Sequence, residues 1–380
     1  MSRSKVLISG GAGFIGRHLA CRLADEGHSV RLLDPLTEQV HGPVPRGLEW
    51  IESHGVELIR GSVTCRRDWD RALKGVEEVA HLAAETGTGQ SMYEVGKYCS
   101  VNVGGTALLL EVLGEMPQRS VRRVLLASSR SVYGEGAFRC VHCDAGRLTP
   151  QPRGLAQLQR NQWEPGCPAC GRELMPVPTA EGDAIQPASI YAATKHAQEE
   201  LVRIGCSSLG VGFGILRLQN VYGEGQSLKN PYTGILSIFS TRIRRGLELP
   251  IFEDGLESRD FVHVSDVVEA FTLALKSKEP VNDVLNVGTG TATSVRDLAA
   301  ELSKALGHEP RLVITGQFRT GDIRHNFADL SKAGKLLGFA PKVDLTEGLR
   351  RFAAWVNEEP LPEDRLDQAN RELQERKLMS

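Results

Sequence analysis

Short apolar runs alternate with longer segments in which apolar residues recur at helical spacing over the first third of the chain. The runs predict five parallel strands, at residues 5–9, 29–33, 56–60, 78–82 and 123–127. Helices are expected between these strands, including helices over residues 68–73 and 93–115. Strands and helices in this alternation are typical of a doubly wound α/β sheet.

The alternation breaks after the fifth predicted strand. Residues 134–183 are rich in Pro, Gly, Cys and Arg, and regular structure resumes with a helix over 189–204 and a strand over 211–218. The pattern is then mixed, with helices expected at 234–245, 265–276 and 294–306 and short strands near 250, 261 and 284–287.

This pattern predicts two domains and a tail. The first spans 1–218 and carries an insertion at 136–183. The second is a smaller mixed α/β domain over 219–356, whose segments are expected to interleave with the sheet. The charged residues of 357–380 predict a solvated helix or a frayed end.

A glycine-rich turn follows the first predicted strand. Residues 5–16 read Lys-Val-Leu-Ile-Ser-Gly-Gly-Ala-Gly-Phe-Ile-Gly, with Gly10, Gly13 and Gly16 at intervals of three. In a dinucleotide site such glycines permit the tight turn, the approach of the backbone to a pyrophosphate and the packing of the helix on the strand. Glycines that serve only the turn are the alternative. The strand before and the helix after favour a Rossmann sheet with the phosphates at the helix N-terminus.

An acidic residue ends the second predicted strand. Asp34 lies 18 residues after Gly16. A carboxylate there accepts hydrogen bonds from the ribose hydroxyls and repels a 2′-phosphate, which favours NAD over NADP. Arg31 lies before the strand end and is not expected to bind a phosphate.

Charge and hydropathy exclude several classes of function. The 380 residues include 45 Lys and Arg against 47 Asp and Glu, a net charge of −2, and no run of like charge stands out. This balance disfavours nucleic acid and anionic membranes as partners. The first residues pass directly into a strand, and no apolar run reaches about 18 residues, so we expect a cytoplasmic protein without a signal peptide or a membrane span.

Three side chains indicate acid–base chemistry at one edge of the sheet. Tyr191 and Lys195 lie four apart on one face of a predicted helix, and an ammonium group beside a phenol favours the phenolate. Ser129 follows the fifth strand, at the carboxyl edge where open α/β sheets bind ligands. A chance meeting of a Tyr and a Lys on an amphipathic helix is the alternative.

Eight cysteines fall into two groups. Cys21, Cys65, Cys99 and Cys206 are scattered and are expected to be inert. The others form two C-x2-C pairs, with 23 residues between the pairs, at a spacing typical of a closed structural zinc site. The expected ligands are Cys140, Cys143, Cys167 and Cys170, with His142 as a substitute. A disulfide or redox pair and free reduced thiols are the alternatives.

The motifs together resemble the extended short-chain dehydrogenase/reductase family, in particular its NAD-dependent nucleotide-sugar epimerases and dehydratases. The resemblance covers about residues 5–355. Besides the glycine turn, its motifs are His81-Leu-Ala-Ala84, Val101-Asn-Val103 with Gly105-Thr106, Ser129, Tyr191 with Lys195, Arg217 to Asn220 with Tyr222-Gly223, and Ser258-Arg-Asp-Phe-Val-His-Val264 with Asp266. It implies NAD as cofactor, a nucleotide-sugar substrate, and a homodimer formed through the helices at 93–115 and 189–204.

The resemblance also implies roles for individual residues. Ser129 is expected to anchor a sugar hydroxyl, Tyr191 to act as the base and Lys195 to activate it. The expected cofactor contacts are Gly10, Gly13, Phe14, Ile15, Gly16, Asp34, Ser62, Val63, Leu82, Ala83, Ala84, Asn102, Tyr191 and Lys195. The expected substrate contacts are Ser129, Arg130, Ser131, Asn220, Arg259 and Arg324, where a surface salt bridge is an equal alternative for Arg324.

One position differs from the family, and three have a second interpretation. Ser62 replaces the Asp with which the family usually holds adenine, so that contact is expected to be weaker or reshaped. Asn102, like His81 and Asp266, is expected to act mainly by packing and hydrogen bonding near the site.

Two residues indicate the reaction class. Relatives that eliminate water carry an acid and a base before the Val-Tyr-Gly at 132–134, and this chain has Arg130 and Ser131 there. A serine is neither acid nor base at neutral pH. Reversible oxidation at carbon 4 of the sugar, through a transient 4-keto intermediate, is the chemistry that remains, and it predicts a 4-epimerase.

The substrate is indicated by resemblance alone. The cysteine insertion, the run Ser-Arg-Ser-Val-Tyr-Gly-Glu-Gly and the segments 217–227 and 230–234 are similar to a subgroup of dTDP-L-rhamnose 4-epimerases. A UDP-hexose or UDP-uronate 4-epimerase and a one-way 4-ketoreductase are the alternatives among enzymes. A binding protein that keeps the NAD fold as a sensor is the alternative from another class, and the retained Ser, Tyr and Lys argue against it.

Overall fold

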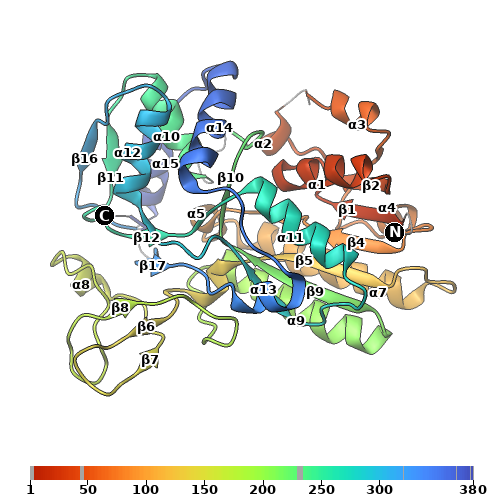
Figure 1. Cartoon of the computed structure of the whole chain (residues 1–380), viewed down its shortest axis with the longest axis horizontal. Helices are drawn as coiled ribbons and strands as arrows, with labels where there is room; N and C mark the ends of the chain where they lie inside the picture. The colour runs from red at the N-terminus through yellow and green to blue at the C-terminus, as the bar shows by residue number, and fades with distance from the viewer. Residues whose placement is uncertain are drawn as a thin grey trace.

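The centre of the molecule is a seven-stranded parallel sheet (Figure 1). The computed structural model describes residues 4–42, 47–228, 234–319, 321–364, 366–376 and 378–379. The strands lie in the order β14-β9-β5-β4-β1-β2-β3 and all run parallel. Their bounds are β1 (Lys5–Ser9), β2 (Ser29–Asp34), β3 (Glu57–Arg60), β4 (Glu78–His81), β5 (Arg123–Ser129), β9 (Gly212–Leu218) and β14 (Val284–Val287). The five predicted strands are confirmed, and β9 and β14 extend the same sheet.

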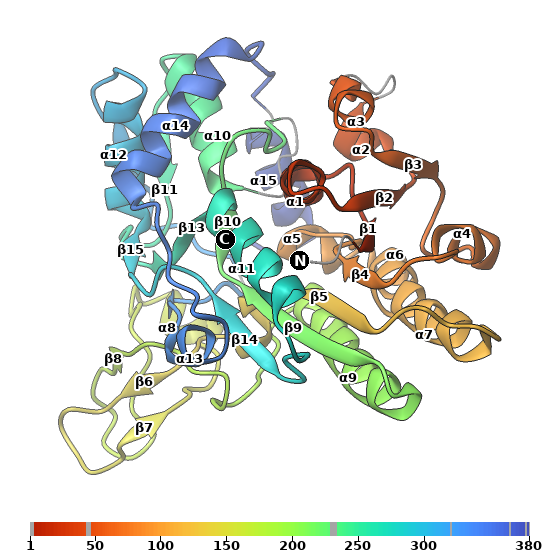
Figure 2. The same ribbon diagram turned by 45° about the vertical axis from the view of Figure 1, so that its right-hand side comes forward.

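Helices cover both faces of this sheet (Figure 2), which confirms the doubly wound α/β fold. Along β1, Val6 and Ile8 face one layer and Leu7 the other, because successive side chains of a strand point to opposite faces. One layer contains α1 (Phe14–Asp25), α11 (Val264–Lys276) and α13 (Ser331–Leu337). The other contains α4 (Arg66–Ala72), α7 (Gly105–Glu115) and α9 (Ile190–Leu209). Short helices connect these layers: α2 (Glu38–His41), α3 (Glu49–Ser53), α5 (Thr88–Ser91) and α6 (Val95–Tyr98).

The helix predicted over 93–115 is interrupted by a wider turn. Between α6 and α7 the chain forms a π-helix, η1 (Cys99–Gly104). This turn buries Asn102, whose side-chain amide bonds the backbone of Glu85 and the hydroxyl of Thr194. Such widened turns are frequent at functional sites. Apolar periodicity did not reveal it, because a single π turn leaves the spacing on either side nearly unchanged.

A second group of elements packs around its own apolar core, formed by three helices and by strands β10 (Asn220–Tyr222), β11 (Leu249–Ile251) and β13 (Phe261–His263). The helices are α10 (Ile235–Arg244), α12 (Val295–Ala305) and α14 (Leu345–Glu358). The strands form small sheets: β10 with β13, β11 with β16 (Leu312–Ile314), and β12 (Ser258–Arg259) between β15 (Thr293–Ser294) and β17 (His325–Asn326). The elements α11, α13 and β14 come from the same half of the chain but belong to the layers of the large sheet.

The cysteine-bearing insertion forms a small unit to one side of the sheet, at the lower left of Figure 1. Its strands are β6 (Phe138–Arg139), β7 (Arg147–Leu148) and β8 (Met175–Pro176), which pair antiparallel in the order β7-β6-β8, and its helix is α8 (Leu155–Leu158). Phe138, Cys140, Cys167 and Leu174 form its apolar core. The insertion therefore leaves the sheet after β5 and returns to it at α9.

The C-terminal segment forms a helix that is exposed along most of its described length and is held at a few buried residues. Helix α15 (Leu366–Glu375) begins with the buried Leu366, and Met379 is also buried and forms a β-bridge with Arg319. The guanidinium of Arg376 lies 4.3 Å from the centre of the Tyr93 ring. Apolar residues among the charged ones give this segment a buried side. Within the described part of the chain, no helix has the length and apolar character needed to cross a membrane.

Candidate active site

The glycine turn connects the end of β1 to α1 in a geometry that requires glycine. Gly10 has a φ of +69°, and a Cβ there would lie 2.8 Å from the backbone of Ala83. A Cβ on Gly16 would lie 2.5 Å from the carbonyl oxygen of Gly10, so only glycine lets α1 pack this closely. The first amides of α1 are free of helical partners and stand at the cavity described below.

Asp34 ends β2 beside this turn. Its carboxylate accepts hydrogen bonds from the amides of Ala12, at 3.1 Å, and Leu36, at 2.8 Å. Arg31 turns to the other face, where it bonds Glu57 and the carbonyl oxygen of Ala72. The structure thus separates Arg31 from the cavity and leaves an acidic group at the end of β2.

A cavity of about 630 Å³ runs along the carboxyl ends of the central strands. It is lined by every predicted cofactor contact except Asn102: Gly10, Gly13, Phe14, Ile15, Gly16, Asp34, Ser62, Val63, Leu82, Ala83, Ala84, Tyr191 and Lys195. The turn after β3 is held by Asp68, whose carboxylate accepts the amide of Ser62 at 2.9 Å, while the Ser62 hydroxyl bonds Thr64. The shape and the residues fit an extended dinucleotide.

Asn102 does not belong to this lining. Its amide is used entirely within the protein, on Glu85 and Thr194. The prediction of a cofactor contact at Asn102 is corrected to a positioning role, since Glu85 and Val101 beside it do line the cavity.

The structure brings together the three predicted catalytic side chains. Ser129 ends β5, and the 3-10 turn η2 (Arg130–Tyr133) follows it, so that the Ser129 hydroxyl accepts the amide of Ser131 at 3.2 Å. Tyr191 lies in the first turn of α9, which Ser189 caps, and it lines the same cavity as Ser129, close enough for the Ser129 hydroxyl to lower the pKa of the phenol. Lys195 lies one turn further and donates to the carbonyl oxygen of Ala127 at 2.9 Å.

Burial dominates the electrostatics of this group. It raises the pKa of the Tyr191 phenol above its ordinary value, while the neighbouring Ser129 hydroxyl and the charge of Arg130 oppose the rise. Burial also lowers the pKa of the Lys195 ammonium to about 7, against the charge of Glu199. In the protein alone, the neighbouring groups therefore offset only part of the rise that burial causes in the pKa of the Tyr191 phenol.

A second cavity, of about 260 Å³, adjoins the first and shares Arg130 and Asn220 with it. Arg259, Arg319 and Asp322 also line it, together with apolar residues such as Phe252. Burial and the charge of Arg259 lower the pKa of Arg130 to about 9, as expected where guanidinium groups converge. A site of this kind suits a diphosphate, because guanidinium groups bind phosphate oxygens through paired donors.

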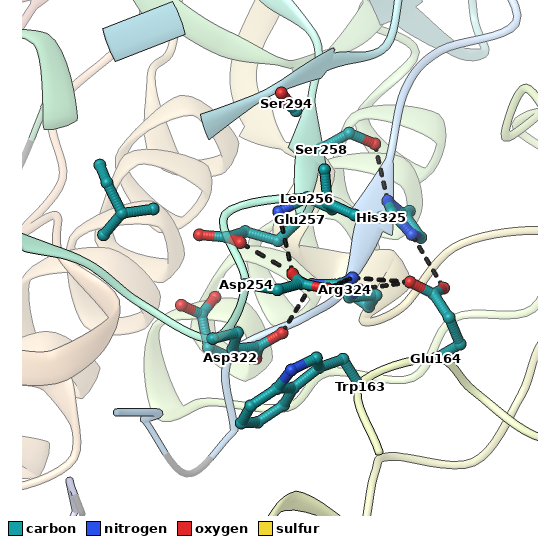
Figure 3. Close-up of polar contacts among 12 residues, drawn as sticks. Trp163, Glu164, Asp254, Leu256, Glu257, Ser258, Ser294, Asp322, Arg324 and His325 are labelled. Carbon is teal, nitrogen blue, oxygen red and sulfur yellow. Dashed lines mark hydrogen bonds and ion pairs between the residues drawn. The ribbon is translucent and has the colours of Figure 1, made fainter. Parts of the chain in front are cut away.

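Arg324 lies elsewhere, and its prediction as a substrate contact is wrong in this structure. Its side chain is 1% exposed and pairs with Glu164, Glu253 and Asp254 (Figure 3). Sequence reasoning missed Arg319 and Asp322 in the same segment. Their signal was a basic and an acidic residue on either side of Gly321, a turn residue that lets both reach one cavity.

The four paired cysteines come together in the insertion. The Sγ atoms of Cys140 and Cys143 lie 3.4 Å apart, and those of Cys143 and Cys167, like those of Cys140 and Cys170, lie 3.7 Å apart. Four thiolates around a tetrahedral zinc, each about 2.3 Å from it, would stand about 3.8 Å apart. A disulfide needs about 2.05 Å, and all four cysteines are free. The arrangement fits a closed four-thiolate metal site, and His142 faces Arg172 instead.

Comparisons with known proteins agree with this geometry. The chain is 38% identical to the dTDP-L-rhamnose 4-epimerase of Burkholderia thailandensis, over 93% of this chain and 95% of the relative. It is 30% identical to a putative UDP-glucose 4-epimerase of Methanocaldococcus jannaschii, over 92% of this chain and 98% of the relative.

Solved structures give the same result. The UDP-glucose 4-epimerase of Thermotoga maritima with UDP-glucose superposes with a TM-score of 0.74 at 28% identity, over 93% of this chain and 99% of that one. MoeE5 in complex with UDP-glucose and NAD superposes with a TM-score of 0.71 at 31% identity, over 93% and 98%. The profile of the NAD dependent epimerase/dehydratase family matches residues 6–153 and 170–288. The chain therefore belongs to the NAD dependent epimerase/dehydratase family.

Proposed function

We propose that this chain is a nucleotide-sugar 4-epimerase that uses NAD. The observation that carries the proposal is that Ser129, Tyr191 and Lys195 line the first cavity beside Arg130 and Asn220, which it shares with the second. One cavity has the shape and lining of a dinucleotide site, and the other collects arginines suited to a diphosphate. A sugar attached to that diphosphate would reach the phenol of Tyr191.

The side chains divide the reaction between them. Tyr191 accepts the proton of the 4-hydroxyl as carbon 4 is oxidised, and it returns the proton to the same oxygen in the reverse step. NAD, when bound, supplies the acceptor and the donor of the hydride. Ser129 holds the 4-oxygen beside the phenol. Because the ketone can present either face before it is reduced, the two steps together invert carbon 4 without net use of the cofactor.

The residues next to Ser129 favour this reaction over elimination. Loss of water needs a general acid for the departing hydroxyl, and the Ser131 hydroxyl is neither an acid nor a base at neutral pH. The Ser131 hydroxyl is buried, and it has no hydrogen-bond partner among the described residues. We assign it to a substrate hydroxyl, together with Arg130 and Asn220, which line both cavities.

The proposed substrate is dTDP-L-rhamnose or its 4-epimer, dTDP-6-deoxy-L-talose. The support is the 38% identity with the Burkholderia thailandensis enzyme along nearly the whole of both chains. UDP-hexoses and UDP-uronates are the second candidates, because other relatives act on such sugars, UDP-glucuronate 4-epimerases of Arabidopsis thaliana among them. The proposed diphosphate contacts are Arg259 and Arg319, and the Asp322 carboxylate pairs with Arg259.

We further propose a structural zinc ion on the four cysteines of the insertion and a homodimer formed on α7 and α9. The sulfur spacing supports the metal. The two helices pack side by side, and Ile204 on α9 is 57% exposed, which supports a partner on this face. Metal analysis and sedimentation velocity test these two points separately.

The decisive experiment is to incubate the purified protein with a panel of dTDP- and UDP-sugars without added NAD(H), and to follow interconversion by NMR. A 4-epimerase converts its substrate to an equilibrium mixture under these conditions. A one-way ketoreductase would need stoichiometric reduced cofactor and a 4-keto substrate. If no sugar of the panel is interconverted, while a 4-keto sugar is reduced on addition of NADH, the ketoreductase takes the place of this proposal.

A further inference from the structure

We propose that the cysteine insertion positions the diphosphate end of the substrate cavity, through Arg153 and Glu164, which hold the segment 322–325 against Arg259. This inference rests on the proposed function for the nature of the ligand. It assigns to the insertion a role in binding, at residues that do not touch the cavity themselves.

Arg259 depends on this segment for its position. Its guanidinium donates to the carbonyl oxygens of Ile323, at 2.7 Å, and Arg324, at 2.9 Å, and to the carboxylate of Asp322, at 3.0 Å. Asp322 itself lines the cavity. A movement of the segment would therefore displace the Arg259 guanidinium together with Asp322, the carboxylate that pairs with it.

The insertion holds the same segment from the other side. Arg153 donates to the carbonyl oxygen of Asp322 at 3.0 Å. Glu164 pairs with Arg324 at 2.7 Å and with His325 at 3.0 Å, and His325 in turn bonds the hydroxyl of Ser258, the residue before Arg259 (Figure 3). The segment is thus clamped between the insertion and β12.

These contacts join buried charged side chains, so rearranging them would cost free energy. The Arg153 side chain is 2% exposed and pairs with Glu135 at 3.2 Å and with Glu253 at 2.9 Å. Glu253 also pairs with Arg324, and it keeps a φ of +48°, which a residue with a Cβ rarely adopts. Loss of one member leaves an uncompensated buried charge, so the network acts as a unit.

Arg147 provides a control, because its ion pair lies within the insertion and away from the segment 322–325. Arg147 pairs with Asp183 and donates to the carbonyl oxygen of Pro178, both at the base of the insertion, and its side chain is 44% exposed. It makes no contact with the segment 322–325 among those that the structure describes. Arg147→Met therefore removes an insertion ion pair without disturbing the clamp.

The experiment compares Arg153→Met, Arg153→Lys, Glu164→Gln and Arg147→Met with the wild type, all as purified with bound cofactor. Affinity for dTDP and for UDP is measured by calorimetry at pH 8. Hydrogen exchange is measured on peptides covering residues 319–328. We expect Arg153→Met to bind the nucleoside diphosphate at least tenfold more weakly, with faster exchange in that segment, and Glu164→Gln to change both in the same direction.

Further results distinguish positioning from stability. Arg153→Lys, which keeps the charge but loses the fork of donors, is expected to recover part of the affinity. Arg147→Met is expected to match the wild type in affinity and exchange. In turnover assays Arg153→Met raises KM more than it lowers kcat.

The outcomes separate the two proposals. If the wild type binds neither dTDP nor UDP, the proposed function is contradicted. Hydrogen exchange in residues 319–328 then still tests whether Arg153 and Glu164 hold the segment 322–325. Unchanged affinity and unchanged exchange in Glu164→Gln and in Arg153→Met overturn the inference, even if both variants melt at lower temperature. If Arg153→Met fails to fold, Glu164→Gln and Arg153→Lys carry the same comparison.

Discussion

Ser129 and Tyr191 line the same cavity, and the Ser129 hydroxyl lies close enough to lower the pKa of the Tyr191 phenol, although 62 positions separate the two residues in the chain. The cysteine insertion occupies most of that interval. The insertion begins after β5 and ends at α9, so the sheet and α9 fix the positions of Ser129 and Tyr191. The relative placement of the two residues therefore does not depend on the path of the insertion. The proposed chemistry depends first on this pair.

Replacing Tyr191 by Phe removes the proposed proton acceptor and leaves the ring in place. We expect epimerase activity to fall about 100- to 10,000-fold, the usual contribution of a general base, with the content of bound NAD unchanged. Interconversion of the preferred nucleotide sugar, followed by NMR, measures the loss.

Tyr98→Phe is the matched control. The Tyr98 ring packs edge-on against Tyr191, with 6.4 Å between ring centres, and its hydroxyl donates to the backbone carbonyl oxygens of Thr86 and Gly87. This variant is expected to retain activity within a few fold. Near-full activity in Tyr191→Phe would contradict the assignment of the base.

Asp34→Asn tests cofactor selection. The amide keeps the size of the side chain but removes the charge that would repel a 2′-phosphate, so we expect discrimination between NAD and NADP to fall about tenfold. Cofactor affinities of protein stripped of its bound dinucleotide, measured by fluorescence quenching, give the ratio. An unchanged preference for NAD would show that another group selects the cofactor.

Substrate affinity is expected to fall as pH rises through about 7. Burial raises the pKa of the Glu257 carboxyl to about 7, with support from the neighbouring acids Glu253 and Asp322, and Glu257 lines the arginine-rich cavity. Below pH 7 the carboxyl is neutral, and above it the added negative charge repels the diphosphate. We expect binding about tenfold weaker at pH 8 than at pH 6.

A nucleotide sugar is the right probe for this effect, because its two phosphates carry no proton near neutral pH. In Glu257→Gln the affinity should be the same at both pH values and close to that of the wild type at pH 6. If the wild type binds the nucleotide sugar equally well at pH 6 and pH 8, Glu257 does not control substrate affinity.

Cys140→Ser tests the metal site. Cys140 is buried in the core of the insertion, and one missing thiolate leaves zinc with three ligands. We expect the zinc content to fall from one ion per chain, with faster tryptic cleavage within residues 136–183 and retained NAD. Cys99→Ser, at an exposed free thiol, should leave the metal in place. Absence of zinc from the purified wild type, with all eight thiols reactive, would refute the site.

The parts of the molecule that the sequence predicted are those encoded by short local patterns. The turn at Gly10, the acidic end of β2 and the spacing of Tyr191 and Lys195 each follow from a few adjacent residues and a regular element. The positions of Asp322 and Arg324 do not, because they lie in an irregular segment that is held by contacts with an insertion more than 150 residues away. Arg319, in the same segment, is held by Phe252 and Asn370. The same holds for the π turn at Asn102, where tertiary hydrogen bonds stabilise a conformation that helical periodicity does not indicate.

The packed C-terminal segment has a practical consequence for anyone who produces the protein. Leu366 and Leu378 form part of the wall of the arginine-lined cavity, and Met379 is bonded to the backbone of Arg319. A purification tag fused after this segment would emerge at the substrate cavity. The first strand, by contrast, begins at Lys5 on the amino edge of the sheet, opposite the ligand edge, and a tag joined at that end leaves the pocket free.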